Sequence, residues 1–160
     1  MDLRVKRSEG LELFKALRGL TNYTTQAAFL IATNFNVVDH LAKEHDRFDE
    51  NLRKQYATKR ELTEEEIESG QFPEGQTEAY EFEDDNKTLK IEGNNLIKYQ
   101  EDYDRYMDEE IEIKGLKPFN KGEFKTRINK PGHRTEVVTA EIPAAFLAPL
   151  SKHKVILDSE

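Results

Sequence analysis

Residues 25–58, TQAAFLIATNFNVVDHLAKEHDRFDENLRKQYAT, contain neither proline nor glycine. Apolar side chains recur along this stretch at steps of three and four residues, which is the spacing of one helix face. The stripe consists of Ile31, Phe35, Val38, Ala42, His45, Leu52 and Tyr56. We therefore predict a single helix, capped by Thr24 or Thr25 and about 50 Å long at a rise of 1.5 Å per residue.

The two halves of this predicted helix differ in composition. Residues 27–32 are apolar nearly all round, so we expect them to be buried by a neighbouring short helix or by another subunit. We expect the core to include Phe29, Ile31, Phe35 and Val38. Residues 43–54 are mostly charged and should face solvent along one side.

Upstream of the long helix, the sequence predicts a strand and a short helix. Residues 2–7 alternate between apolar and charged side chains, which is typical of a strand. Ser8 is a suitable N-cap for a helix that carries Leu11, Phe14 and Leu17 on one face. We expect Gly19 to end this helix in the left-handed conformation.

Downstream, the pattern predicts a capped turn of helix and a hairpin. Thr63 and Glu66 form a capping-box signature before a very short helix that ends at Gly70. Alternation at 80–83 and 89–91, around the turn-forming residues 84–86, predicts a first β-hairpin.

The remaining third of the chain predicts further short elements. Asn94 or Asn95 should cap a helix that ends near Met107, and residues 111–113 should form a strand. The remaining predicted elements are a second hairpin (124–129 and 134–141) with a type II turn at Pro131-Gly132, a helix at 144–150 after Pro143, and a strand at 155–157.

These elements predict an α+β fold with a long central α-helix, shorter helices and two β-hairpins. We expect one domain, 1–160, in which 61–93 is an acidic hairpin insertion and 123–142 a projecting hairpin arm. Apolar residues make up 36% of the chain and charged residues 35%. A thin core of this kind favours an elongated or assembly-dependent fold.

The composition also limits the environment and the chemistry. The chain has no cysteine, which excludes disulfides, thiol nucleophiles and Cys-based zinc sites. No apolar run is long enough for a membrane span, and residues 1–7 lack the apolar stretch of a signal peptide. We expect no membrane association and a location in the cytoplasm of a bacterium or of an infected host.

Charge is distributed unevenly along the chain. Residues 61–112 carry 19 acidic and 4 basic side chains, a net charge of −15, although the whole chain has a net charge of −8. In one interpretation the acidic middle and the basic ends partly neutralise one another, within the fold or across an oligomer. In the other, an acidic face mimics nucleic acid or docks a basic partner.

No arrangement of residues predicts catalysis. The histidine pair His40 and His45 has a spacing of five rather than the four that places two ligands on one helix face, so we expect no metal site with Glu44. No glycine-rich phosphate loop and no nucleophile elbow are present. We predict no enzyme activity and assign no catalytic, cofactor-binding or metal-binding residue.

Two groups of residues are candidates for partner binding. The aromatic pair Tyr80 and Phe82 lies in the acidic hairpin, and Lys125, Arg127, Arg134 and Val137 lie in the basic one. The basic hairpin could touch phosphate, remain a solvated ribbon, or pair with a neighbouring subunit through an open edge. We do not expect direct nucleic-acid binding through the tyrosines of the predicted helix near 96–107, because carboxylates surround them.

The layout also carries a resemblance. The segments SEGLELFKAL (8–17), LAKEHDRF (41–48), LRKQY (52–56) and EEIEI (109–113), with a late Pro-initiated Ala/Leu helix, resemble small uncharacterised proteins of tailed bacteriophages. The similarity covers residues 3–60 and 95–150, and the basic hairpin departs from it. The resemblance implies a phage context, in an infected bacterial host or in the virion, and assigns no catalytic residue.

Together, these observations lead to two functional hypotheses. The first is a non-enzymatic bacteriophage assembly or virion-associated protein that binds itself or other phage structural proteins. The alternative is an acidic inhibitor that binds a nucleic-acid-binding or defence protein of the host.

Overall fold

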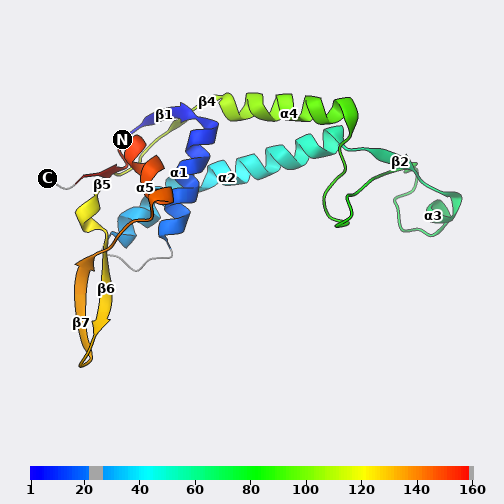
Figure 1. Cartoon of the computed structure of the whole chain (residues 1–160). Helices are drawn as coiled ribbons and strands as arrows, with labels where there is room; N and C mark the ends of the chain where they lie inside the picture. The colour runs from blue at the N-terminus through cyan, green and yellow to red at the C-terminus, as the bar shows by residue number, and fades with distance from the viewer. Residues whose placement is uncertain (22–26, 159–160) are drawn as a thin grey trace. The chain divides into compact units, whose positions relative to one another are not determined.

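The computed structural model describes residues 1–21 and 27–158 (Figure 1). The chain divides into two compact units. Unit 1 comprises Met1–His45 and Tyr106–Glu160, and unit 2 comprises Asp46–Arg105. The predicted α+β class is confirmed: the described residues form five α-helices, one 3-10 turn and four pairs of short strands.

Helices and short strands alternate irregularly along the chain. In chain order they are β1 (Leu3–Lys6), α1 (Arg7–Leu20), α2 (Ala28–Tyr56), β2 (Lys59–Glu61), α3 (Glu64–Glu68), β3 (Glu78–Tyr80), α4 (Gly93–Asp108), β4 (Glu110–Ile113), β5 (Phe119–Asn120), η1 (Lys121–Glu123), β6 (Lys125–Lys130), β7 (Arg134–Thr139), α5 (Ala144–Lys152) and β8 (Ile156–Leu157). Within the described residues, no helix is long and apolar enough to cross a membrane.

The predicted long helix is confirmed as α2, with 29 residues. Its predicted caps, Thr24 and Thr25, lie outside the described residues. Ile31, Val38 and Leu52 of the predicted stripe are buried, but the placement of Phe29 in the core was wrong, since its side chain is 75% exposed. Two positions along a helix turn its surface by about 200°, so Phe29 faces away from the buried Ile31.

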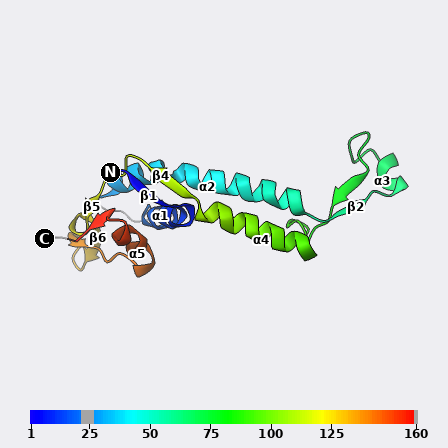
Figure 2. The same cartoon turned by 90° about the horizontal axis from the view of Figure 1, so that it is seen from above.

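The core of unit 1 forms where α1 packs against α5 and the β1–β4 pair (Figure 2). The largest fully buried side chains come from segments far apart in the sequence: Phe119, Phe124, Leu13, Leu17 and Leu20. The strand predicted around 111–113 is confirmed as β4 and pairs antiparallel with β1, so that Val5 lies opposite Ile111. The predicted last strand is β8, which pairs parallel with β5.

The ends of α1 differ from the prediction. Lys6, not Ser8, precedes the first helical turn, and its backbone N–H donates to Glu9 Oε2 at 3.0 Å. Gly19 does not end the helix, which continues to Leu20. A Cβ atom at Gly19 would lie 2.3 Å from Cζ of Phe146 in α5, so any larger residue at this position requires the Phe146 ring to move.

Asn34 of α2 is the one fully buried polar residue among those that the structure describes. Its amide nitrogen donates to the carbonyl oxygen of Lys117 at 2.8 Å, and its amide oxygen accepts from the N–H of Lys117 at 2.7 Å. The amide thus pairs with both the N–H and the C=O of one backbone residue, as a strand residue does in a ladder. It therefore fixes α2 to the segment that leads into β5.

The second predicted hairpin is confirmed as β6–β7, which extends away from the helices of unit 1 (Figure 1). Gly132 has φ 85°, the value that the third residue of a type II turn requires. The predicted helix after Pro143 is confirmed as α5, although it continues through Pro149 to Lys152.

Unit 2 contains residues 61–93, the predicted acidic insertion. The predicted capping box is confirmed, because Thr63 Oγ1 accepts from the N–H of Glu66 at 3.2 Å at the start of α3. The predicted first hairpin is reduced to one bridge between Phe82 and Leu89, while the longer ladder joins β3 to the unpredicted strand β2. The chain changes partner at Glu81, whose N–H donates to the carbonyl of Thr58 at 2.8 Å.

The turn at 84–87 depends on Asp85. Its Oδ1 accepts from the N–H groups of Lys87 and Thr88, each at 2.8 Å, and its Oδ2 accepts from the Thr88 hydroxyl at 2.6 Å. The following helix, α4, begins at Gly93, so Asn94 and Asn95 lie in its first turn rather than before it.

Candidate protein-interaction surfaces

The predicted partner-binding residues lie in both units. Tyr80 and Phe82 belong to unit 2, at the end of β3 and at the bridge that follows it. Lys125, Arg127, Arg134 and Val137 belong to the β6–β7 hairpin of unit 1, where Arg127 lies opposite Val137. The structure thus presents two surfaces, which we describe separately.

Tyr80 and Phe82 separate two open hollows of unit 2, each of about 600 Å³. Both side chains line both hollows, because residues 80 and 82 project to the same side of an extended chain. The Phe82 side chain remains 49% exposed. We call this pair the aromatic ridge, and the hollows beside it the α2 hollow and the β3 hollow.

The wall of the α2 hollow consists of ion pairs along one helix. Arg53 Nε lies 2.8 Å from Asp49 Oδ2, and Lys54 Nζ lies 2.7 Å from Glu50 Oε1. The opposite side comes from the aromatic ridge and from Lys87, Thr88 and Leu89. The hollow therefore combines paired charges on its α2 wall with aromatic and aliphatic side chains on the other side, a mixture that protein interfaces also have.

Polar and aromatic residues also line the β3 hollow. Arg60 donates to both carboxylate oxygens of Glu66, at 2.8 and 2.9 Å, and this pair fixes the guanidinium at the edge of the hollow. Phe72 contributes a further aromatic side chain, and the other polar lining residues are Gln76, Glu81, Asn86 and Lys90. Since aromatic and arginine side chains contribute most to protein interfaces, this composition favours a protein partner.

Hydrogen bonds between α2 and α4 support the α2 hollow within unit 2. The Tyr99 hydroxyl donates to Asp49 Oδ1, and the Tyr56 hydroxyl donates to Asp102 Oδ2 at 2.5 Å. Burial, followed by the hydrogen bond to Asp49, raises the pKa of Tyr99 to about 12. The phenol therefore stays protonated, as the hydrogen-bond donor to Asp49, at pH values where a free tyrosine is already ionised.

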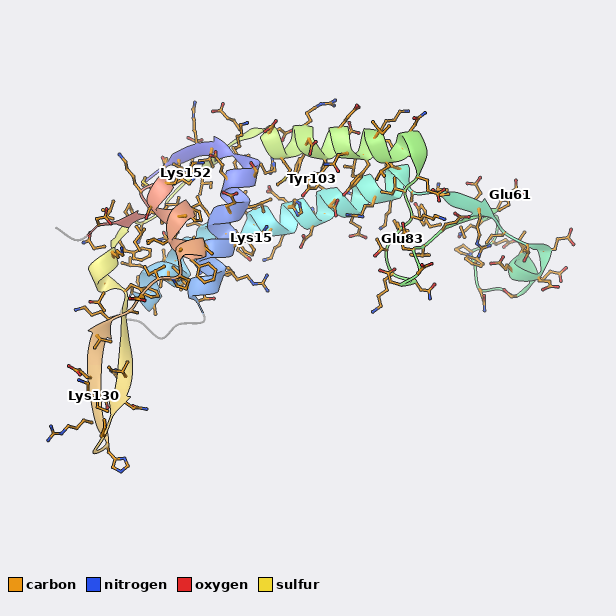
Figure 3. The ribbon with its side chains drawn as sticks, in the orientation of Figure 1. Lys15, Glu61, Glu83, Tyr103, Lys130 and Lys152 are labelled. Atoms are coloured by element: carbon orange, nitrogen blue, oxygen red, sulfur yellow. The ribbon has the colours of Figure 1, made fainter. Side chains whose placement is uncertain are left out.

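The second surface is the β6–β7 hairpin, which we call the arm. Most of its described side chains are exposed, on both faces, and Val137 is 46% exposed. Lys130, labelled near the tip in Figure 3, forms an ion pair with Glu136. Lys125 and Arg127 project from one face, whereas Lys130 and Arg134 project from the other. This division leaves neither face as a concentrated basic patch.

Glu44 and the two histidines of α2 lie in different surroundings. Glu44 Oε2 lies 3.3 Å from the guanidinium of Arg7, which also stacks over the Tyr106 ring at 4.2 Å. His40 is exposed and His45 is half-buried on the apolar stripe. Within the described residues, no group of three or more His, Asp or Glu side chains is arranged to hold a metal ion.

The sequence did not reveal several residues that complete the hollows. Phe72 lies in an irregular segment, and Leu89 was assigned only to a strand pattern, so neither position indicated its role. The Asp49–Arg53 pair has the i, i+4 spacing of helical ion pairs and could have been found from that signal.

Comparisons with protein-family models, with curated proteins and with solved structures found no significant match. The function therefore has to be argued from the two surfaces themselves.

Proposed function

We propose that this chain is a non-enzymatic protein-interaction component of tailed-bacteriophage assembly, acting in the infected bacterial cytoplasm or in the virion. The phage context follows the sequence resemblance, and the interaction role follows the surfaces. The partner is another phage structural protein, which binds unit 2 at the aromatic ridge.

One observation carries this proposal: an aromatic pair, the half-buried Tyr80 and the exposed Phe82, borders two open hollows. The exposed part of Phe82 and the hollows of about 600 Å³ on either side offer pockets for two side chains of a partner. A segment in extended conformation fits best, since alternate side chains of a strand point to the same side and would enter the two hollows in turn. Apolar side chains at those positions match the aromatic walls.

The test is capture of partners by the tagged chain from phage-infected cells, with identification by mass spectrometry and a search for the chain in purified virions. We expect capture of a phage structural protein by the wild type and its loss with Phe82→Ala. Truncation of a central aromatic side chain at an interface commonly costs about 2 kcal/mol or more, which corresponds to roughly 30-fold in affinity.

A matched control is Ile67→Ala in α3. Ile67 is 52% exposed and belongs to the same unit, but it lines neither hollow. It should leave capture unchanged. The proposal fails if Phe82→Ala and Ile67→Ala behave alike, or if the chain is absent from both virions and complexes of phage proteins.

A second candidate function, inhibition of a basic host protein, is favoured by the charge of unit 2. Residues 61–86 carry 11 acidic side chains and no basic one. Asp85 and Glu66 maintain local structure, so neutralisation should spare them and target Glu61, Glu64, Glu65, Glu83 and Asp84. Salt-sensitive binding to a basic host protein that is lost in this variant would favour inhibition, and unchanged affinity would reject it.

A further inference from the structure

The two open edges of the arm expose different residues. In an antiparallel pair, opposite residues alternate between hydrogen-bonded and non-hydrogen-bonded pairs. The N–H of Ala140 donates to the carbonyl of Phe124 at 2.9 Å, and the register from Lys125↔Thr139 to Lys130↔Arg134 continues this ladder. The outward N–H and C=O groups therefore belong to Thr135, Val137 and Thr139 on β7, and to Lys125, Arg127 and Asn129 on β6.

The two edges differ in how well they suit pairing with another strand. The β6 edge carries Lys125 and Arg127, and long cationic side chains on an edge strand discourage pairing with another strand. The β7 edge carries only uncharged β-branched side chains at its outward positions, which are the residues that favour strand pairing. Within the described residues, no further strand pairs with either edge.

We propose that a second copy of this chain pairs with the β7 edge, so that two arms form a four-stranded antiparallel sheet about a two-fold axis. Val137 then lies opposite Val137 of the second copy, and Thr135 lies opposite Thr139. All three outward positions are used in this register, and each outward N–H meets an outward C=O.

The charge pattern of β7 fits this occupant. In the proposed register Arg134 lies opposite Ala140 of the second copy and Glu136 lies opposite Val138, so no two like charges are directly opposed. Glu136 is already paired with Lys130 of its own arm. A direct pairing of two β6 edges would instead bring cations together.

The proposed sheet is also closed to further growth. The β6 strands become its outer edges, and their Lys125 and Arg127 side chains oppose the addition of another strand. The assembly is therefore a dimer with an isologous interface, the commonest symmetry of soluble oligomers. Nucleic acid is a poorer occupant, because the cations are divided between two faces and residues 125–139 contain no Phe, Tyr or Trp for base stacking.

A pair of proline variants tests the proposal. Val137→Pro removes an outward N–H without removing a hydrogen bond inside the arm, since proline is tolerated where the N–H of an edge strand faces solvent. Arg127→Pro is the matched control, because residue 127 lies opposite residue 137 and its N–H faces the other edge. Light scattering with size exclusion, over a range of concentrations, measures the mass of each full-length variant.

We expect a dimer for the wild type and for Arg127→Pro, and at least tenfold weaker dimerisation for Val137→Pro. A wild-type monomer at all concentrations, an assembly larger than a dimer, or equal effects of the two prolines overturns the proposal.

A cysteine variant keeps the test valid if a proline disturbs folding. The chain has no cysteine, so Val137→Cys introduces a single thiol. Directly opposite residues of hydrogen-bonded pairs have Cα atoms about 5.5 Å apart, which a disulfide can span. Oxidation should cross-link Val137→Cys into a covalent dimer but not Lys125→Cys, and equal cross-linking of both would reject the register. This inference does not depend on the aromatic ridge, because Phe82→Ala should leave the dimer intact.

Discussion

The ring of Phe146 in α5 occupies the space beside Gly19 in α1, where a Cβ atom would lie 2.3 Å from Phe146 Cζ. We therefore predict that Gly19→Ala lowers the free energy of unfolding, although alanine is the better helix former. Overpacking of this kind commonly costs about 1–3 kcal/mol. Urea unfolding followed by circular dichroism measures the change.

Two further variants separate this steric effect from a general effect of alanine in α1. Gly19→Ala combined with Phe146→Leu should recover part of the loss, so that the two changes are not additive. Gly10→Ala should cost less, because its nearest neighbours, at 3.0 Å, are the methyl groups of Ile111 and Leu41. Equal losses for the two glycines would contradict the argument.

The buried amide of Asn34 leads to a second prediction. Asn34→Leu keeps most of the volume but removes both partners of the Lys117 backbone, at 2.7 and 2.8 Å. An unsatisfied buried polar group costs about 1–3 kcal/mol, and since both hydrogen bonds to Lys117 are only partly buried, we expect a total loss of roughly 1–3 kcal/mol in unfolding free energy. Asn36→Leu, exposed on the same helix, is the control and should change stability little. Similar values for the two variants would refute the role of Asn34.

The raised pKa of Tyr99 leads to a third prediction, a loss of stability at high pH. Because its pKa is raised from 10.0 to about 12 in the folded chain, its contribution is fully present below pH 10 and is lost as pH rises to 12. The difference in unfolding free energy between wild type and Tyr99→Phe should therefore shrink over this range. Absorbance titration should also show one fewer late-ionising tyrosine in the variant. A constant difference at all pH values would contradict the assignment.

The lowered pKa of Glu66 leads to a fourth prediction, a loss of stability at low pH. Its hydrogen bonds to Arg60 and to the Thr63 backbone lower its pKa from 4.5 to about 2. The stabilisation of α3 is therefore present above pH 4.5 and is lost as pH falls through 2. Carboxyl NMR titration should show an upward shift of the Glu66 midpoint in Arg60→Gln and little change in Lys59→Gln. An unchanged midpoint in Arg60→Gln would rule out the pairing.

The sequence predicted the elements that depend on local signals. The spacing of Ile31, Val38 and Leu52 predicted α2, the Thr63 capping box predicted α3, and Pro131-Gly132 predicted the turn of the arm. In each case residues adjacent in the chain, or on one helix face, determine the local conformation.

The remaining features depend on contacts between distant residues. Nothing near Gly19 indicates that a ring from residue 146 fills the space beside it, so its usual role as a helix end was the natural prediction. Similarly, β2 has too short a pattern to be recognised without β3. The two hollows could not be predicted for the same reason, because segments apart in the sequence supply their walls. Helix α2 and residues 80–89 line the α2 hollow, and β2, β3 and irregular segments line the β3 hollow.

The two edges of the arm also depend on contacts that the sequence does not reveal. The sequence identified Lys125, Arg127 and Val137 but could not assign them to different edges, since this requires the register. Only the hydrogen-bond alternation, fixed by Ala140 and Phe124, separates a guarded edge from an open one.

The way the chain is divided has a consequence for its synthesis. Unit 2 is continuous in sequence, whereas unit 1 combines residues 1–45 with residues 106–160. Residues that enclose the core of unit 1, such as Phe119, Leu150 and Val155, leave the ribosome late. The first 45 residues must therefore wait with apolar surface uncovered, and α1 is the segment for which a chaperone would compete during translation.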